Sequence, residues 1–232
     1  MRAENRCYLF DAGEPVSRAL MKAGVDFNEI DRLFLSHLHA DHCGGLAQLL
    51  QSMQLAKRKK LLPIHLPAEG VEYVELMRRT MYLFDEVFPY RVELVPWKAG
   101  QAIEDGGNRI VPFPTTHLKH YPKQVGPKYK QAFEAFALRV ETATGRSVVY
   151  SGDLGKPEDL ATALLPQTDL LIHECAHFPA SSVFNFLKPQ PVGRVVVTHF
   201  APPEQRAAAV KLGKEMMGEK VSFSQDGMEV AL

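Results

Sequence analysis

The stretch Ser36-His37-Leu38-His39-Ala40-Asp41-His42 is the most informative part of this 232-residue chain. It places three imidazoles and one carboxylate within the six residues from His37 to His42. These donor types are the ones that Zn²⁺ and similar borderline metal ions prefer in proteins. A short apolar run precedes the stretch and Gly44-Gly45 follows it, so it reads as a loop between a strand and a helix. So many ligand types in one loop have little structural purpose, and we therefore predict a metal site there.

On both sides of this loop the sequence alternates predicted strands and helices. Apolar runs predict strands over residues 8–10, 32–35, 62–66, 91–95, 109–113, 132–140, 147–150, 169–172 and 194–197. Helical spacing predicts helices after Pro15, over 46–53, from 67 to about 83, and over 181–187 and 204–217. Strands clustered in mid-chain with helices on both flanks favour a layered α/β sandwich, with sheets inside and helices outside.

The composition indicates a globular protein of balanced charge. Hydrophobic residues make up 46% of the chain and charged residues 23%, which is enough for a real core. The 27 Lys and Arg residues balance 27 Asp and Glu residues, so there is no global attraction for nucleic acid or acidic membranes. Three scattered cysteines suggest a reducing compartment, and no apolar run could span a bilayer. We expect a cytoplasmic protein without a membrane partner.

The loop from His37 to His42 resembles the HxHxDH signature of the metallo-β-lactamase-fold metallohydrolases. Further stretches resemble that family's motifs in the family's order: Leu9-Phe10-Asp11-Ala12-Gly13, Tyr150-Ser151-Gly152-Asp153, Leu171-Ile172-His173-Glu174 and Val197-Thr198-His199-Phe200. The later motifs look most like the RNase Z-like and small phosphodiesterase branch. The resemblance implies a four-layer αββα sandwich of the α/β class, as one domain over residues 1–232.

The N-terminus departs from the family pattern. Members usually have two strands before the position of Asp11, whereas ten residues precede it here. The resemblance therefore implies that the first N-terminal strands are lacking and that the opening hairpin is truncated. We expect an exposed strand edge at Tyr8–Phe10, through which the chain would form a homodimer.

The resemblance also implies two divalent metal ions, with Zn²⁺ favoured and Mn or Fe as alternatives. The implied ligands are imidazoles and carboxylates: His37 and His39 for the first ion, Asp41, His42 and His199 for the second, and Asp153 bridging both. A hydroxide shared by two such ions is a nucleophile at neutral pH, and Asp41 would orient or deprotonate it.

A third histidine would complete the first ion's ligands. His117 lies just beyond the predicted strand 109–113, whereas His120 lies three residues on, in a lysine-rich loop. A ligand at a strand end is held more rigidly than one within a loop, which favours His117. His120 stays open as the alternative.

The remaining histidines are less defined. In the RNase Z-like branch a histidine before the last ligand assists the reaction, and His177 stands at a similar place. The family's small-residue motif is replaced there by Ala176-His177-Phe178-Pro179, so His177 is either catalytic or a helix-entry residue. His65 reads as an ordinary strand histidine. His173, beside Glu174, either orients a ligand or is a satisfied buried side chain.

These features favour a hydrolase acting on a phosphodiester or nucleotide-type substrate, a small anionic molecule. Lysines at 119, 123, 128 and 130, and a second basic cluster over 57–60, would steer an anion unless they are merely solvated. No long Gly- and Pro-rich arm precedes residue 109, so a long nucleic acid such as tRNA is not expected as a partner. The alternatives are hydrolysis of a thioester, lactone or lactam, redox chemistry at non-heme iron, and a catalytically idle metal-binding protein.

Overall fold

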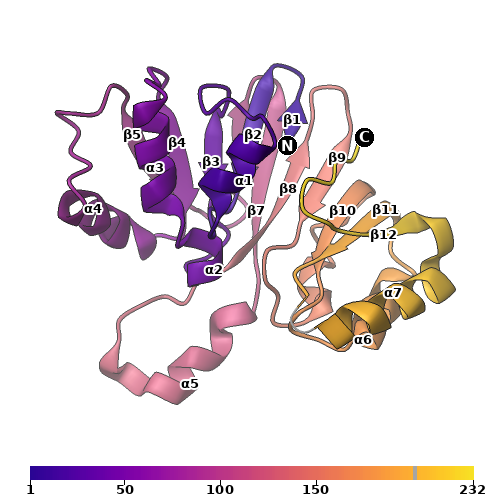
Figure 1. Ribbon diagram of the computed structural model, residues 1–232. Helices are drawn as coiled ribbons and strands as arrows, with labels where there is room; N and C mark the ends of the chain where they lie inside the picture. The colour runs from indigo at the N-terminus through magenta and orange to yellow at the C-terminus, as the bar shows by residue number, and fades with distance from the viewer. Residues whose placement is uncertain (201–202) are drawn as a thin grey trace. The chain divides into compact units, whose positions relative to one another are not determined.

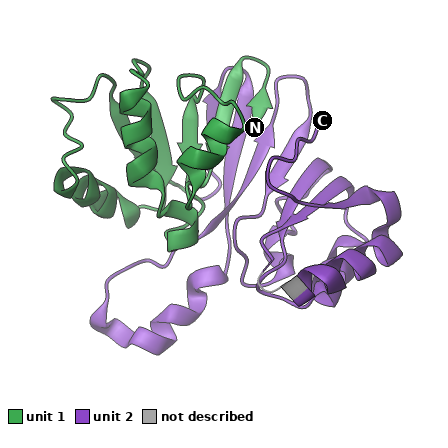
Figure 2. Cartoon of the chain, viewed as in Figure 1, with its two compact units in different colours: residues 1–98 green, residues 99–232 purple. Residues whose placement is uncertain are grey.

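The computed structural model describes residues 1–200 and 203–232. The chain divides into two compact units, Met1–Lys98 (unit 1) and Ala99–Leu232 (unit 2), which Figure 2 shows in green and purple. Each unit is built around one sheet. Among the described residues, no helix is both long and apolar enough to cross a membrane.

Unit 1 contains a five-stranded sheet in the order β1-β2-β3-β4-β5. The strands are β1 (Arg2–Ala3), β2 (Arg6–Phe10), β3 (Arg32–Phe34), β4 (Leu62–Leu66) and β5 (Val92–Pro96). β2 to β5 are parallel, and β1 is antiparallel to β2. Because parallel strands end at the same edge, the loops after β2 and β3 both leave the sheet there. These loops carry Asp11 and the histidine-rich stretch.

The helices of unit 1 are α1 (Val16–Lys22), α2 (Ala40–Cys43), α3 (Leu46–Leu55) and α4 (Gly70–Thr80). Leu46, Leu49, Leu50 and Met53 repeat at helical spacing along α3, and all four are buried. They pack in one core with Leu33 of β3 and Ile64 of β4, so α3 covers a face of the sheet. This burial is the main contribution that fixes α3 beside the metal-site loop.

The outer edge of β2 is not open at Tyr8. The backbone N–H of Tyr8 donates to the carbonyl oxygen of Met1 at 2.8 Å, and the Met1 amino group donates back to the Tyr8 carbonyl oxygen at 2.8 Å. β1 continues this pairing, with Arg2 opposite Cys7. The expectation of an exposed edge is therefore wrong at Tyr8, because the chain's own first residues form the neighbouring strand there. This pairing removes Tyr8 from the edge through which a homodimer was expected.

Unit 2 contains a seven-stranded sheet in the order β12-β11-β10-β9-β8-β7-β6. The strands are β6 (Ile103–Asp105), β7 (Asn108–Pro114), β8 (Phe136–Glu141), β9 (Ser147–Tyr150), β10 (Thr168–Glu174), β11 (Val192–Thr198) and β12 (Val221–Phe223). β6 to β9 pair antiparallel, whereas β9 to β12 are parallel. Consequently β7, β9, β10 and β11 all end at the same edge of this sheet.

The helices of unit 2 are α5 (Tyr121–Val125), α6 (Ala180–Leu187) and α7 (Pro203–Met217), with 3₁₀ turns η1 (His117–His120), η2 (Gly126–Lys128), η3 (Pro157–Leu160) and η4 (Gly218–Lys220). α6 and α7 lie side by side in Figure 1, and Phe184 of α6 is buried with Val195 and Val197 of β11. The sequence placed most elements correctly. It did not predict β1, β6 or β12, and it began β8 at 132 rather than at Phe136.

Candidate metal centre

The predicted loop of unit 1 connects the end of β3 to the start of α2. Within it, the ring centroids of His37 and His39 lie 4.7 Å apart, and those of His37 and His42 lie 4.1 Å apart. His37 and His42 are buried, whereas the side chain of Asp41 is 59% exposed and has Oδ2 3.7 Å from His42 Nε2. The loop therefore gathers three imidazoles and presents one carboxylate to solvent.

Asp11, at the end of β2, holds this loop in place. Its Oδ1 accepts the backbone N–H of Ser36 at 2.7 Å, and its Oδ2 accepts the Ser36 hydroxyl at 2.9 Å. His42 Nδ1 donates to Oδ2 at 2.6 Å, which leaves Nε2 as the ligand atom that this ring offers. Asp11 adopts a left-handed backbone with φ of 57°, and two residues on a Cβ at Gly13 would lie 1.8 Å from the Asp41 carbonyl oxygen. Our sequence interpretation named Asp11 only as part of a motif, because its partners are 25 or more residues away.

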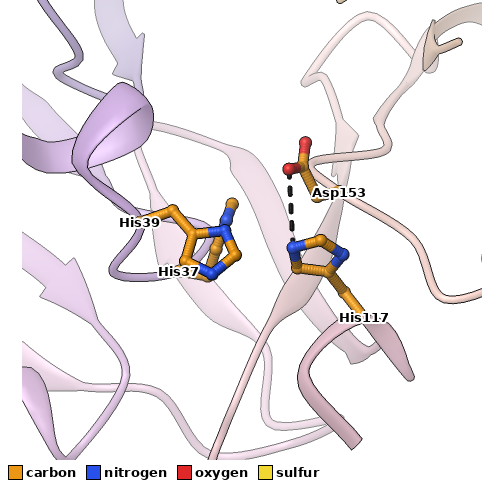
Figure 3. A group of neighbouring side chains, drawn as sticks. All are labelled: His37, His39, His117 and Asp153. Carbon is orange, nitrogen blue, oxygen red and sulfur yellow. Dashed lines mark ion pairs between the residues drawn. The ribbon is translucent and has the colours of Figure 1, made fainter. Parts of the chain in front are cut away.

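In unit 2, Asp153 follows β9 and lies among three histidines. Its carboxylate oxygens are 3.6 Å from His117 Nε2, 3.6 Å from His199 Nε2 and 3.8 Å from His177 Nε2. Asp153 is 2% exposed, and Figure 3 shows the His117 ring directed toward it. Figure 3 also labels His37 and His39 of unit 1. His199 follows β11 and, like Asp11, has a left-handed backbone, with φ of 53°.

The structure distinguishes His117 from His120. His117 is buried at the start of η1 with its ring next to Asp153. His120 is exposed, and its Nδ1 lies 3.0 Å from the His117 carbonyl oxygen. The geometry therefore favours His117, as the strand-end argument did, although its role as a ligand stays a prediction.

Glu174, the last residue of β10, orients His177. Its Oε1 lies 3.0 Å from His177 Nδ1, and its carboxylate also accepts the backbone N–H groups of Leu154, Ala176 and His177 at 2.9–3.2 Å. Burial alone would raise the pKa of Glu174, but these hydrogen bonds, led by the one from His177, lower it below its ordinary value. Glu174 is therefore a carboxylate that fixes the His177 ring with Nε2 toward Asp153.

The other two histidines have structural surroundings. His65 of β4 lies beside the rings of Phe34 and Trp97, with Nε2 3.1 Å from an Arg32 nitrogen. His173 is fully buried; its Nδ1 donates to the Glu174 carbonyl oxygen, and burial lowers its pKa. These surroundings agree with an ordinary strand residue at 65.

The second basic cluster is only partly a surface feature. Arg58 is fully buried. Lys57, Lys59 and Lys60 are exposed, and Lys60 forms an ion pair with Asp31. The lysines of the segment after His117 are all exposed.

Groups in both units offer atoms that could hold a metal ion. In unit 2, the ligand atoms of Asp153, Glu174 and His177 all lie within 4.8 Å of one another. In unit 1 the same limit holds for the pair His37 and His39 and for the pair Asp41 and His42. Imidazole nitrogens and carboxylate oxygens fit Zn²⁺, Mn²⁺ and iron, so the donor chemistry agrees with the predicted ions.

Comparison with known proteins identifies relatives across nearly the whole chain. The model of the beta-lactamase superfamily domain matches residues 6–218. Ribonuclease Z of Archaeoglobus fulgidus is 25% identical over 96% of this chain and 87% of its own length. That alignment runs over 272 positions, more than the 232 residues of this chain, so the relative contains insertions.

Two solved structures share the fold. The metallo-beta-lactamase fold protein YhfI from Bacillus subtilis has a TM-score of 0.75 and 20% identity, covering 98% of this chain and 87% of its own. The short form of human tRNase Z has a TM-score of 0.70 and 22% identity, covering 100% of this chain and 90% of its own. One fold thus accounts for both sheets.

Proposed function

The chain belongs to the beta-lactamase superfamily, and we propose that within it this protein is a metal-dependent hydrolase that cleaves phosphodiester bonds of RNA. Support for the substrate comes from the ribonuclease Z relative and the tRNase Z structure, both of which match along most of this chain. Support for the reaction comes from the histidine and carboxylate groups in the two units.

Three predictions from the sequence are confirmed by these matches: the family resemblance, the α/β fold class and a metal-dependent hydrolase. The expectation that a long nucleic acid is not a partner is wrong, because the relatives are ribonucleases. That expectation relied on zero net charge and on a missing arm. Net charge is a sum over the whole chain, whereas a polyanion binds wherever cations are locally concentrated.

The residues that would hold the ions are those the family signature implies: His37, His39, Asp41, His42, His117, Asp153 and His199. We propose two divalent ions, with Zn²⁺ preferred because five of these seven ligands are imidazoles. Bound ions would lower the pKa of water and stabilise negative charge on a phosphate. Asp11 binds Nδ1 of His42 and fixes the orientation of that ring, and Glu174 does the same for His177.

We propose two side chains for proton transfer. Asp41 is the exposed carboxylate of the loop, so it can accept a proton from an attacking water. His177 has Nδ1 held by Glu174, so Nε2 is the atom that would donate a proton to the departing oxygen. A helix-entry residue would need no such buried carboxylate partner, and this favours the catalytic role for His177.

The segment after His117 has the chemistry of an RNA contact. It exposes four lysines, Lys119, Lys123, Lys128 and Lys130. Aromatic rings alternate with them: Tyr121 stacks on Phe133 at 5.8 Å, and Lys128 Nζ lies 5.1 Å from the ring of the exposed Tyr129. Cations bind phosphates and aromatic rings stack on unpaired bases, so this segment suits single-stranded RNA.

The observation that carries the proposal is Asp153, a buried carboxylate whose oxygens lie within 3.8 Å of the Nε2 atoms of three histidines. The test loads the purified protein with Zn²⁺ or Mn²⁺ and incubates it with RNAs, starting with a tRNA bearing a 3′ extension. We expect cleavage that a chelator abolishes and that Asp153→Ala lowers at least about 10³-fold.

The alternatives give different results in the same experiment. Turnover of a thioester or lactone without RNA cleavage would contradict RNA as the substrate and assign the protein to that other ester class. Iron content with oxygen consumption would indicate redox chemistry, and two bound ions without any turnover would indicate an idle binding protein.

A further inference from the structure

Two loops of unit 2 must be held close together for the side chains of His117 and Asp153 to be neighbours. His117 follows β7 and Asp153 follows β9, and β8 lies between these strands in the sheet. Neighbouring strands are about 4.8 Å apart, so the two loops start about 10 Å apart at the same edge. The sheet alone does not bring them together, and an additional connection is needed.

Asp159 of η3 provides that connection. Its Oδ2 accepts the backbone N–H of Thr116 at 2.8 Å and the Thr116 hydroxyl at 2.9 Å. The same oxygen accepts the backbone N–H of Gly155 at 3.0 Å and that of Lys156 at 3.4 Å. One carboxylate thus binds the residue before His117 and two residues that follow Asp153.

Two further contacts press the loops together. The Thr115 hydroxyl donates to the backbone carbonyl oxygen of Asp153 at 2.9 Å. A Cβ at Gly155 would lie 2.1 Å from the Thr116 hydroxyl and 2.7 Å from its carbonyl oxygen, so only glycine allows this approach. The contact is therefore too close to tolerate independent movement of either loop.

We propose that Asp159 is a positioning residue for metal binding. It acts through Thr116 and Gly155 to keep His117 and Asp153 at a fixed position relative to each other. Among the described residues, the Asp159 carboxylate bonds to Thr116, Gly155 and Lys156 rather than to the side chains of the proposed ligands. The inference rests on the proposed metal site, but it makes its own prediction about metal affinity. Groups that support metal ligands typically change metal affinity by about 10- to 100-fold when removed.

The test compares Asp159→Asn with Asp169→Asn. Asp169 is a matched control because it also accepts a backbone N–H and a hydroxyl, both from Ser147, at 2.8 and 2.9 Å. Ser147 begins β9, so Asp169 supports the opposite end of that strand from Asp153. Zn²⁺ affinity is measured by competition with a chromophoric chelator, and the ligand field by the absorption spectrum of the Co²⁺-loaded protein.

We expect Asp159→Asn to weaken Zn²⁺ binding by about 10- to 100-fold and to change the Co²⁺ spectrum, with both properties unchanged in Asp169→Asn. Thr116→Val, which lacks the hydroxyl, should show part of the loss of Zn²⁺ affinity. Thr116→Ser, which keeps the hydroxyl, should bind Zn²⁺ as tightly as wild type. Thermal unfolding of the metal-free proteins controls for a general loss of stability.

Wild-type Zn²⁺ affinity and Co²⁺ spectrum in Asp159→Asn would overturn the proposal, as would equal losses in both Asp variants. If Asp159→Asn does not fold, the Thr116 pair gives the decision by the same measurements. A wild-type protein that binds metal but leaves RNA intact would refute the proposed function and leave this comparison valid.

Discussion

Arg58 illustrates how the surroundings of one residue override its chemical type. Its side chain is fully buried, and its guanidinium donates to the carbonyl oxygens of Phe27, Ile30, Lys60 and Leu61 at 2.7–2.9 Å. Four carbonyl oxygens from two segments, 27–30 and 60–61, thus share one cation. Burial lowers the pKa of Arg58, but the guanidinium remains charged at neutral pH because its ordinary pKa is so high.

Replacing Arg58 should therefore destabilise unit 1. Arg58→Met keeps an unbranched apolar chain but leaves the four carbonyl oxygens without a donor, so we expect the free energy of unfolding to fall by about 3 kcal/mol. Urea unfolding followed by circular dichroism measures this change. Lys59→Met, at an exposed neighbouring position, is the control and should stay within about 0.5 kcal/mol of wild type. A similar result for both variants would show that the buried contacts contribute little.

His173 should make stability depend on pH. Burial lowers its pKa from the ordinary 6.5, and Nε2 has no hydrogen-bond partner among the described residues. Below pH 6.5 the unfolded chain binds a proton that the folded chain does not, so the free energy of unfolding falls as the pH drops from 6.5 toward the lowered pKa. Above 6.5 the ring is neutral in both states and contributes no slope.

His173→Asn, whose amide can replace the Nδ1 donor, should flatten this part of the profile. The measurement is the urea midpoint at half-unit pH steps between 5 and 8. His120→Asn removes an exposed histidine and should keep the wild-type slope. An unchanged slope in His173→Asn would assign the pH dependence to another group.

At the scale of elements, the segment 119–130, which runs from η1 to just beyond η2, should contribute substrate binding rather than chemistry. Changing Lys119, Lys123, Lys128 and Lys130 together to Ala removes four exposed cations. We expect KM for RNA to rise at least about 10-fold with kcat nearly unchanged. The slope of log K for binding against log salt concentration should become shallower by about 0.7 for each phosphate contact that is lost. Steady-state kinetics between 50 and 200 mM salt test this. Lys57→Ala with Lys59→Ala is the control for charge alone.

The sequence predicted elements well where one local pattern determined them. The spacing of Leu46, Leu49 and Leu50 located α3, and the metal-site loop was found from its six residues. Strands β1, β6 and β12 were not predicted, because each has only two or three residues, too few for any periodicity to appear. Residues 117–128 were expected to be a loop and form short helices, where Pro122 occupies the first turn of α5.

The site was only partly predictable for a related reason. Histidine spacing is visible in one stretch of sequence, whereas Asp11, Glu174 and Asp159 each also bind a group that lies 20 to 43 residues away. Such contacts depend on which strands become neighbours. Nothing in a single sequence without an alignment records that choice.

At the scale of the whole molecule, metal binding should dominate thermal stability. A ligand that binds only the folded state stabilises it by about 4 kcal/mol at a concentration 1,000 times its Kd. We therefore expect the melting temperature to rise with Zn²⁺ concentration and to drop on chelation, as measured by calorimetry. Asp153→Ala should lose most of this rise. A melting temperature that is independent of Zn²⁺ would contradict the proposed ligand set.

The left-handed backbone of His199 implies a conflict between the stability of the folded protein and its activity. A non-glycine residue costs about 1–2 kcal/mol in this conformation, and glycine does not bear that cost. His199, with φ of 53°, is therefore a position where His199→Gly should be more stable than His199→Ala by about 1 kcal/mol, while both lose the imidazole. Selection for heat resistance alone would favour glycine there. A variant of this protein stabilised by glycine at 199 should be inactive, because it lacks the imidazole that we propose as a metal ligand.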